Sequence, residues 1–426
     1  MLYTGCVRSG CHLNAALLLV SALALSAIST VSSADNEFYI PKPNKSVWHQ
    51  AVDLIRHHEW ENAGLLIDMV ITPQAIWFTT GTPNEVKRKV RRQVRRAHRL
   101  SVVPILVAYN IPFRDCAQFS AGGAANVQEY KDWIDGFAAG IGNKKALVIL
   151  EPDGLGIIPW YTTFEGTLEW CRPPEANPAT AAAERFEMFN YAVDALKAKP
   201  NVALYLDGTH SGWLNVGDSA DRLAKAGVAR ADGFYLNASN YQHTANLGQY
   251  GTWISQCIAQ GGGSGCADQY WNGGPAGTAI ADLIGPWNGV ALSGLGEWSD
   301  TATQPEFNTS GINARYWAAG QTHFVIDTSR NGQGPWAPTV SYPDPQDWCN
   351  PPGRGVGLAP TTVTGNALID AYVWIKIPGE SDGKCTRGLG PVGTTDPEWG
   401  IIDPAAGKWF SEQALGLARK ANPPLH

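Results

Sequence analysis

Charge is scarce in this chain. Asp, Glu, Lys and Arg make up only 16% of its 426 residues, and the formal net charge of −6 argues against a nucleic-acid partner. Neither a Cys-x-x-Cys pair nor a His-rich tract occurs, so we expect no metal and no other cofactor. The chain also lacks an internal repeat and a long Pro/Ser/Thr-rich linker. A separate substrate-targeting module is therefore not expected.

The N-terminal segment has little apolar length. Arg8 and His12 precede an apolar run over 15–27, and the small residues 32–34 suit a cleavage site. This run is shorter than the roughly 20 apolar residues that a membrane span requires. We therefore expect residues 1–34 to be a secretory signal, with a retained membrane anchor as the alternative. The processed protein would be secreted, with no membrane partner.

Short apolar runs that end in acidic residues are the most informative pattern. Residues 146–150 resemble a buried strand, and Pro152 ends it because proline donates no hydrogen bond to a sheet. Polar or aromatic residues stand at the ends of this run and of five others: Glu151 and Asp153; Tyr109, Arg114 and Asp115; Lys376, Glu380 and Asp382; Asp68; Asp207 and His210; Asp327 and Arg330. Turn formation alone could explain one or two such endings, but six favour one shared site. In α/β barrels, active sites lie at the carboxyl ends of the strands.

Aromatic residues are abundant, with 17 Trp and 14 Tyr. Indole rings stack flat against the C–H faces of sugars, so this composition suits a protein that binds carbohydrate.

Residues 85–100 could suggest an anionic partner, because eight of their sixteen positions are Lys or Arg. An apolar stripe recurs at helical spacing beneath this charge, formed by Val86, Val90, Val94 and Ala97. We interpret the segment as an outer helix of a barrel with a solvated charged face. Residues 179–198 predict a second amphipathic helix, rich in Ala.

Seven motifs resemble the signatures of glycoside hydrolase family 6, the inverting cellulases. In chain order they are VAYNIPFRDC, LVILEPDGLG, YLDGTHSGWL, LNASNY, HFVIDTSRNGQGP, DWCNPP and WIKIPGESDG. The resemblance implies an α/β fold, a distorted seven-stranded parallel β/α barrel (TIM-like) with its active-site cleft at the C-terminal rim of the strands. One catalytic domain would occupy 48–426. The polar residues 35–47 before it are expected to form a loosely docked arm.

The resemblance also implies catalytic roles. Asp153 matches the general acid, which must remain protonated until it protonates the leaving glycosidic oxygen. The negative charge of Asp115 would raise the pKa of Asp153, and Asp115 would help to organise the hydrolytic water. Tyr109 matches a tyrosine that distorts the sugar at the cleavage point. Asp382 matches the proposed base, with activation of water through a relay as the alternative.

Other motif positions match substrate subsites. Stacking is implied for Trp77, Trp213 and Trp348, and hydrogen bonding to sugar hydroxyls for His210, Asn240, Lys376 and Glu380. Thr79 occupies a substrate-binding position that is often acidic in the family. Arg114 and Arg330 would hold nearby carboxylates charged. We interpret Asp207 and Asp327 as residues that brace loops outside the site.

The mature chain would have six cysteines, an even number that suits disulfides in an oxidising compartment. Their spacing alone leaves the pairing open. The resemblance implies the pairs Cys116–Cys171 and Cys349–Cys385. Cys257 and Cys266 lie outside the family pattern, and a third bridge between them is the simplest prediction.

The function implied is hydrolysis of β-1,4-glucan by a secreted enzyme, expected to be a monomer with a polysaccharide as its partner. A short loop favours an endoglucanase, because Cys385 follows Asp382 by only three residues where tunnel-forming members carry a longer lid. Val216 also replaces a tryptophan often found there. The tail KWFSEQALGLARKANPPL looks more like that of chain-end enzymes, so a cellobiohydrolase is the alternative. A non-catalytic glucan-binding protein is the alternative of another class.

Overall fold

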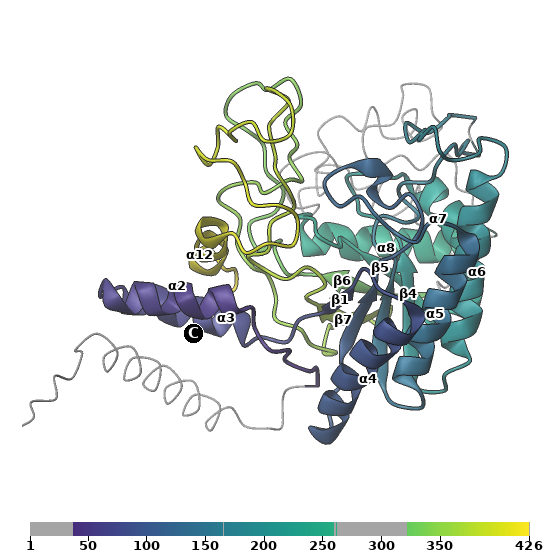
Figure 1. Ribbon diagram of the computed structural model, residues 1–426, viewed down its shortest axis with the longest axis horizontal. Helices are drawn as coiled ribbons and strands as arrows, with labels where there is room; N and C mark the ends of the chain where they lie inside the picture. Colours follow the sequence, from purple (N-terminus) through teal and green to yellow (C-terminus); the bar gives the residue numbers. More distant parts are fainter. Residues whose placement is uncertain (1–36, 165, 260, 262–321, 426) are drawn as a thin grey trace, which may run out of the picture.

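Seven parallel strands form one curled sheet of order β1 to β7 (Figure 1). The computed structural model of this protein describes residues 37–164, 166–259, 261 and 322–425. The strands are β1 (Ile76–Phe78), β2 (Ile105–Ala108), β3 (Ala146–Leu150), β4 (Val202–Asp207), β5 (Gly233–Leu236), β6 (His323–Asp327) and β7 (Ile369–Val373). Each strand pairs in parallel with the next.

Among the described residues, β1 and β7 do not pair as strands, but two hydrogen bonds connect the chain at these two edges of the sheet. The Ala75 N–H donates to the Trp374 carbonyl at 2.8 Å. The indole N–H of Trp77 donates to the Ile375 carbonyl, also at 2.8 Å. The predicted fold, a distorted seven-stranded parallel barrel, is confirmed.

Alternate residues of the buried strands serve two cores. Ile105, Val107, Leu147 and Ile149 belong to the cluster inside the barrel. Their neighbours Leu106, Ala108, Val148 and Leu150 belong to the larger cluster beneath the helices. This division follows from strand geometry, in which successive side chains point to opposite faces. Because both faces are apolar, the strands appear in the sequence as continuous apolar runs.

Five helices cover the outside of the barrel (Figure 1). They are α4 (Pro83–Arg99), α5 (Val127–Ile141), α6 (Ala181–Lys197), α7 (Val216–Lys225) and α8 (Thr244–Ala259). The first and third confirm the helices predicted over 85–100 and 179–198. Short 3₁₀ turns span Asp115–Ala117 and Val228–Arg230.

A side layer of three helices lies beside the barrel (Figure 1). One of these helices occupies a segment for which a strand was predicted. The layer consists of α2 (Lys45–Arg56), α3 (Trp60–Val70) and α12 (Ser411–Arg419). The run around Asp68 was expected to be a strand but lies in α3, where Leu66 and Met69 are buried against the other two helices. A short apolar run does not distinguish a strand from a buried helix, and tertiary packing decided this one.

The segment before α2 is held more firmly than its polar composition indicated. Phe38 and Tyr39 are buried, and Phe38 belongs to the cluster inside the barrel. The Tyr39 N–H donates to the Val103 carbonyl, and the Val103 N–H donates to the Glu37 carbonyl, both at 2.9 Å. The predicted signal over 1–34 lies outside the described residues. None of the helices described is both long and apolar enough to cross a membrane.

Candidate active site

A cavity of about 790 Å³ opens where the strands end. It is lined by all twelve residues predicted to be catalytic or substrate-binding: Tyr109, Asp115, Asp153, Asp382, Trp77, Thr79, His210, Trp213, Asn240, Trp348, Lys376 and Glu380. These residues follow different strands, and parallel strands bring their carboxyl ends to one rim. Four of the six predicted endings, those after β2, β3, β4 and β7, supply lining residues. The endings at Asp68 and at Asp327 and Arg330 do not line the cavity, although Arg330 contacts Asp382.

The turn after β3 separates the roles of two acids. Glu151 and Asp153 both adopt left-handed backbone angles, with φ of 49° and 64°. The Glu151 carboxylate points inward and accepts the N–H groups of Asn110 and Ile111 at 2.8 and 3.0 Å. Its complete burial raises its pKa to about 7. Glu151 thus ties the turn after β3 to the end of β2, which leaves Asp153 facing the cavity.

Asp153 lies in surroundings that disfavour its negative charge. Among the residues described, none donates a hydrogen bond to its carboxyl group. Burial raises the pKa of Asp153 well above its ordinary value, and the negative charges of Asp207, Asp115 and Asp382 raise it further. The Lys376 ammonium lowers it only in part. This environment therefore favours the protonated form of the Asp153 carboxyl group.

Asp207 acts both as a brace and as a charge. Its carboxylate accepts the N–H groups of Leu155, Gly156 and Thr209 at 3.0–3.2 Å, as expected of a residue that holds a loop. However, the Asp207 charge also raises the pKa of Asp153, and its effect is larger than that of the Asp115 charge. The sequence prediction named only Asp115 for this effect, because the contact between the ends of β3 and β4 is not visible in a linear motif.

Asp115 lies in a strained loop beside the acid. Its backbone φ is 57°, and its carboxylate accepts the Ser120 N–H at 2.6 Å. Burial raises the pKa of Asp115 to about 6, although this bond and the Arg114 charge oppose the shift. Asp115 is therefore a far stronger base than an ordinary solvated aspartate.

Arg114 acts on a nearby acid in the predicted direction, because its charge lowers the pKa of Asp115. Its guanidinium forms no ion pair within the described chain and donates instead to four backbone carbonyls, those of Thr79, Tyr109, Ser120 and Ala121. It also lies 4.5 Å from the centre of the Tyr109 ring. Arg114 thus fixes the loop around Asp115 to the strand ends. Every residue has a backbone carbonyl, so no sequence motif could indicate which carbonyls Arg114 binds.

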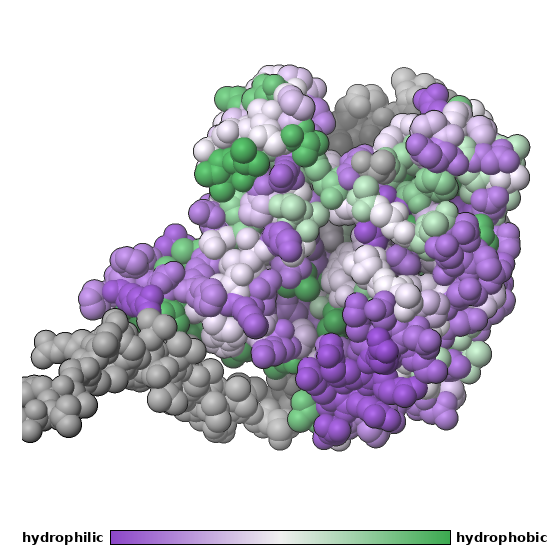
Figure 2. Space-filling model, viewed as in Figure 1, coloured by the Kyte–Doolittle hydropathy of each residue, from purple (hydrophilic) through white to green (hydrophobic). Residues whose placement is uncertain are grey.

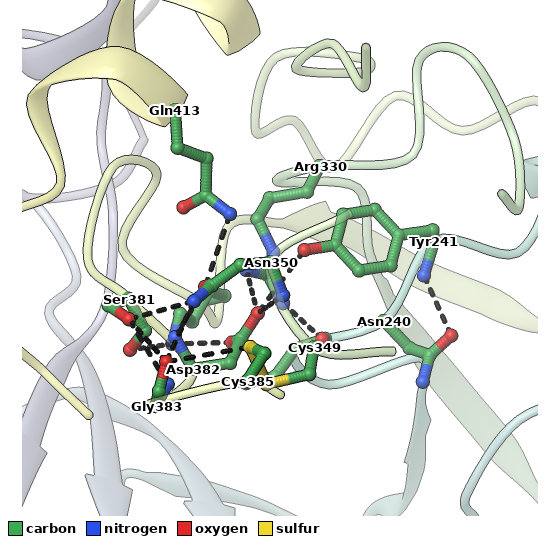
Figure 3. Close-up of polar contacts among 12 residues, drawn as sticks. Asn240, Tyr241, Arg330, Cys349, Asn350, Ser381, Asp382, Gly383, Cys385 and Gln413 are labelled. Atoms are coloured by element: carbon green, nitrogen blue, oxygen red, sulfur yellow. Dashed lines mark hydrogen bonds and ion pairs between the residues drawn. A yellow bond between two sulfur atoms is a disulfide. The ribbon is translucent and has the colours of Figure 1, made fainter. Parts of the chain in front are cut away.

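Asp382 is held between two cations, as Figure 3 shows in part. Its carboxylate lies 2.8 Å from Arg330 Nη1 and 2.9 Å from Lys376 Nζ. It also accepts the Asn350 N–H at 3.0 Å and the Tyr241 hydroxyl at 3.3 Å. Burial alone would raise its pKa, but Arg330 and Lys376 lower it to about 2. The predicted pairing of Arg330 with a carboxylate is confirmed, and Lys376 contacts this acid too.

The loop that carries Asp382 is cross-linked to its neighbour. Cys349 and Cys385 form a disulfide, and the Asn350 amide accepts the Asp382 N–H at 2.8 Å and donates to the Gly383 carbonyl at 2.9 Å (Figure 3). A second disulfide joins Cys116 to Cys171. Both pairs were implied by the family resemblance and are confirmed. The third expected pair includes Cys266, which lies outside the described residues.

Aromatic side chains form the walls of the cleft. Trp77 meets Tyr109 edge-on with ring centres 5.3 Å apart, and Trp213 lies 5.7 Å from the His210 ring. Trp213 also needs a glycine beside it, because a Cβ on Gly156 would lie 2.6 Å from its indole. Burial lowers the pKa of His210 to about 3, so its ring is neutral.

Sequence reasoning missed several lining residues, among them Phe119, Trp170 and Trp336. Trp170 is the most exposed of these, at 50%. Both of its chain neighbours are immobilised, since Glu169 pairs with the buried Arg222 and Cys171 is disulfide-bonded. Its position directly before a predicted disulfide cysteine was the one signal that could have found it.

Comparison with known proteins agrees with this geometry. Residues 33–421 match the family "Glycosyl hydrolases family 6". The chain is 32% identical to endoglucanase 1 of Streptomyces halstedii, with 88% of this chain and 92% of that protein covered. It is 30% identical to the probable 1,4-β-D-glucan cellobiohydrolase C of Aspergillus niger, with 82% and 69% covered.

Endoglucanase A of Thermobispora bispora is 31% identical over 84% of this chain, which spans only 61% of that relative. Among solved structures, the endoglucanase Cel6 of Mycobacterium tuberculosis, in complex with methyl-cellobiosyl-4-deoxy-4-thio-β-D-cellobioside, is 32% identical. It superimposes with a TM-score of 0.61 and covers 91% of this chain and 98% of that one. A family match over most of the chain, on this barrel and with these acids at its rim, makes the protein a member of glycosyl hydrolases family 6.

Proposed function

We propose that this protein is a secreted endoglucanase that hydrolyses internal β-1,4-glucosidic bonds with inversion. The observation that carries the proposal is Asp153, a carboxyl group whose pKa is raised by burial and by three neighbouring acids, in a cleft lined by tryptophans. The names of the relatives and the predicted signal over 1–34 support the substrate and the secretion.

In the proposed reaction, Asp153 donates its proton to the glycosidic oxygen as the bond to the anomeric carbon breaks. A water attacks that carbon from the opposite face and must lose a proton. The pKa of Asp382, about 2, makes it a poor acceptor, whereas that of Asp115 is about 6. We therefore propose that the proton passes through water to Asp115. Asp115 then returns a proton to Asp153, whose pKa is raised well above its ordinary value by burial and by the neighbouring acids.

Asp382 would then serve as a fixed negative charge. Positive charge develops on the sugar ring in the transition state, and an anion that cannot be protonated stabilises it throughout the reaction. Arg330 and Lys376 keep Asp382 ionised and in place.

The remaining lining residues would bind the glucan. Trp77, Trp213 and Trp348 line the cavity and would stack on sugar rings, and Tyr109 would press on the sugar at the cleavage point. His210 remains neutral, so it can accept as well as donate a hydrogen bond to a sugar hydroxyl. Asn240, Glu380 and Thr79 add polar groups to the same cavity.

Internal cleavage requires a cleft that is open along its length. The disulfide at Cys385 leaves only two residues after Asp382 before the chain is tied to Cys349, which is too short for a lid at this point. The cellobiohydrolase among the relatives keeps chain-end cleavage as the second candidate.

Two measurements test the proposal. Asp153→Asn should reduce turnover of cellohexaose by at least a hundredfold while binding of the oligosaccharide persists, because the acid supplies about 10²–10⁴ in rate. Normal turnover by this variant would refute the assignment of the acid. Viscosity of carboxymethyl-cellulose should fall steeply for each new reducing end. Reducing ends without a viscosity change would identify a cellobiohydrolase, and neither signal from a folded sample would favour a glucan-binding protein.

A further inference from the structure

Six arginines form a ridge along the exposed face of α4. The arginine ridge consists of Arg88, Arg91, Arg92, Arg95, Arg96 and Arg99, all of them exposed. These six side chains alone line a cavity of about 280 Å³. Spacings of three and four residues place them on one side of the helix, over a length of about 16 Å. Figure 2 shows the same surface as a continuous hydrophilic area over α4.

The ridge is not neutralised by neighbouring acids. Within the described residues, none of its arginines forms an ion pair, and α4 contains a single acid, Glu85. That acid serves the helix start instead, where it forms a capping box with Thr82. Like charges three and four residues apart destabilise a helix by a few tenths of a kcal/mol for each pair. A solvated outer helix usually alternates its charges, so this one departs from what stability alone favours.

The ridge also contrasts with the rest of the protein. Eight of the 32 Lys and Arg lie within residues 87–99, which contain no acid. The other 24 are set against 38 Asp and Glu, which leaves a formal charge of −14 on the remainder of the chain. A local positive surface on an acidic protein attracts an anionic partner to one place.

The helix beneath the ridge is packed closely against the barrel. Val86, Val90 and Val94 are buried on the opposite face of α4. On α5, a Cβ at Gly140 would lie 2.7 Å from the Cβ of Val90, and one at Gly136 would lie 2.3 Å from the Pro83 carbonyl oxygen. The helix that carries the guanidinium groups is therefore held in place. A row of positive charges along one helix face suits a linear ligand.

The ridge is separate from the active-site cleft. None of its arginines lines the 790 Å³ cavity. The helix runs from the carboxyl end of β1 back to the start of β2, along the outside of the barrel. A polymer could therefore occupy the ridge while the cleft holds another chain.

We propose that the arginine ridge binds a polysaccharide that carries carboxylate groups along its chain. The guanidinium fork matches a carboxylate through two parallel hydrogen bonds. The inference rests on the proposed function, because it adds a second polysaccharide site, outside the cleft, to a glucan hydrolase. Nucleic acid is disfavoured because α4 has no exposed Phe, Tyr or Trp for base stacking, and because the acidic remainder repels a duplex, which carries about one negative charge per 1.7 Å of its axis.

Binding of the mature protein to polygalacturonate tests the proposal. The ridge variant Arg91→Gln/Arg92→Gln/Arg95→Gln keeps good helix formers. The control variant Arg56→Gln/Lys145→Gln/Lys420→Gln removes the same charge from exposed positions elsewhere. We expect the ridge variant to bind at least tenfold more weakly than the wild type at low salt. The control should remain within about twofold, and added salt should weaken wild-type binding.

Three outcomes would overturn the proposal: equal affinity of the ridge and control variants, no binding by the wild type, or duplex DNA binding as tightly as polygalacturonate. Hydrolysis of uncharged cellohexaose is measured in the same samples and should be unchanged in both variants. Failure of the wild type to cleave cellohexaose would refute the proposed function, whereas loss of polygalacturonate binding alone would refute only the role of the ridge.

Discussion

Replacement of Arg330 with leucine tests how much the buried ion pair between Arg330 and Asp382 stabilises the protein. Arg330 is fully buried, and its guanidinium lies 2.8 Å from the Asp382 carboxylate and 4.4 Å from the centre of the Tyr241 ring. In Arg330→Leu, Asp382 keeps Lys376 at 2.9 Å but loses its other cation. Breaking a buried ion pair by removing one partner costs about 3–5 kcal/mol. Because Lys376 remains, we expect the free energy of unfolding at pH 7 to fall by about 3 kcal/mol.

The loss should depend on pH in a defined direction. The pKa of Asp382 lies at about 2 in the folded protein, below its ordinary value of 3.8. The ionised carboxylate therefore stabilises the fold above pH 4, by about 2 kcal/mol, and this contribution disappears as the pH falls from about 4 to about 2. The Arg330→Leu variant lacks most of this stabilisation. The difference in free energy of unfolding between wild type and variant should therefore be constant from pH 5 to 7 and become smaller below pH 4.

Urea-induced unfolding, followed by tryptophan fluorescence at several pH values, measures this difference. Arg230→Leu is a matched control, because Arg230 lies 2.9 Å from Asp194 in a pair that is largely exposed. Such a pair contributes at most about 1 kcal/mol. Equal losses for the two variants, or a difference that stays constant below pH 4, would refute the reasoning.

Two further predictions concern activity. Asp207→Asn removes a negative charge that raises the pKa of Asp153, so the alkaline limb of kcat/KM on cellohexaose should move to lower pH; an unmoved limb would contradict the effect of that charge. Trp170→Ala removes a half-exposed indole from the wall of the cleft and should raise KM for cellohexaose about fivefold, for one stacking contact of about 1 kcal/mol. Trp60→Ala is its control, because Trp60 is 58% exposed on α3 and does not line the cavity, and an equal effect of both changes would show that Trp170 contributes no subsite.

The sequence determined the fold class and the rim of the barrel. Continuous apolar runs that end in acids specify strands buried on both faces, and such strands need a parallel sheet covered by helices. Pro152 ends the strand beside Asp153, which placed this acid at the rim, and the resemblance implied its role. The two confirmed disulfides followed from the resemblance. Asp68 shows the limit of this reasoning, because a short apolar run carries too little periodicity to separate a helix from a strand.

Only the tertiary structure decided the electrostatics of the site. Asp382 is ionised because Arg330, 52 positions earlier in the chain, is brought to its side by the adjacent ends of β6 and β7. Asp207 influences Asp153 for the same reason, across the ends of β4 and β3. A pKa depends on burial and on charges nearby in space, and neither quantity is local in sequence. Residue types and their order therefore indicated which acids face the cleft, while their protonation was set by the neighbours that folding supplied.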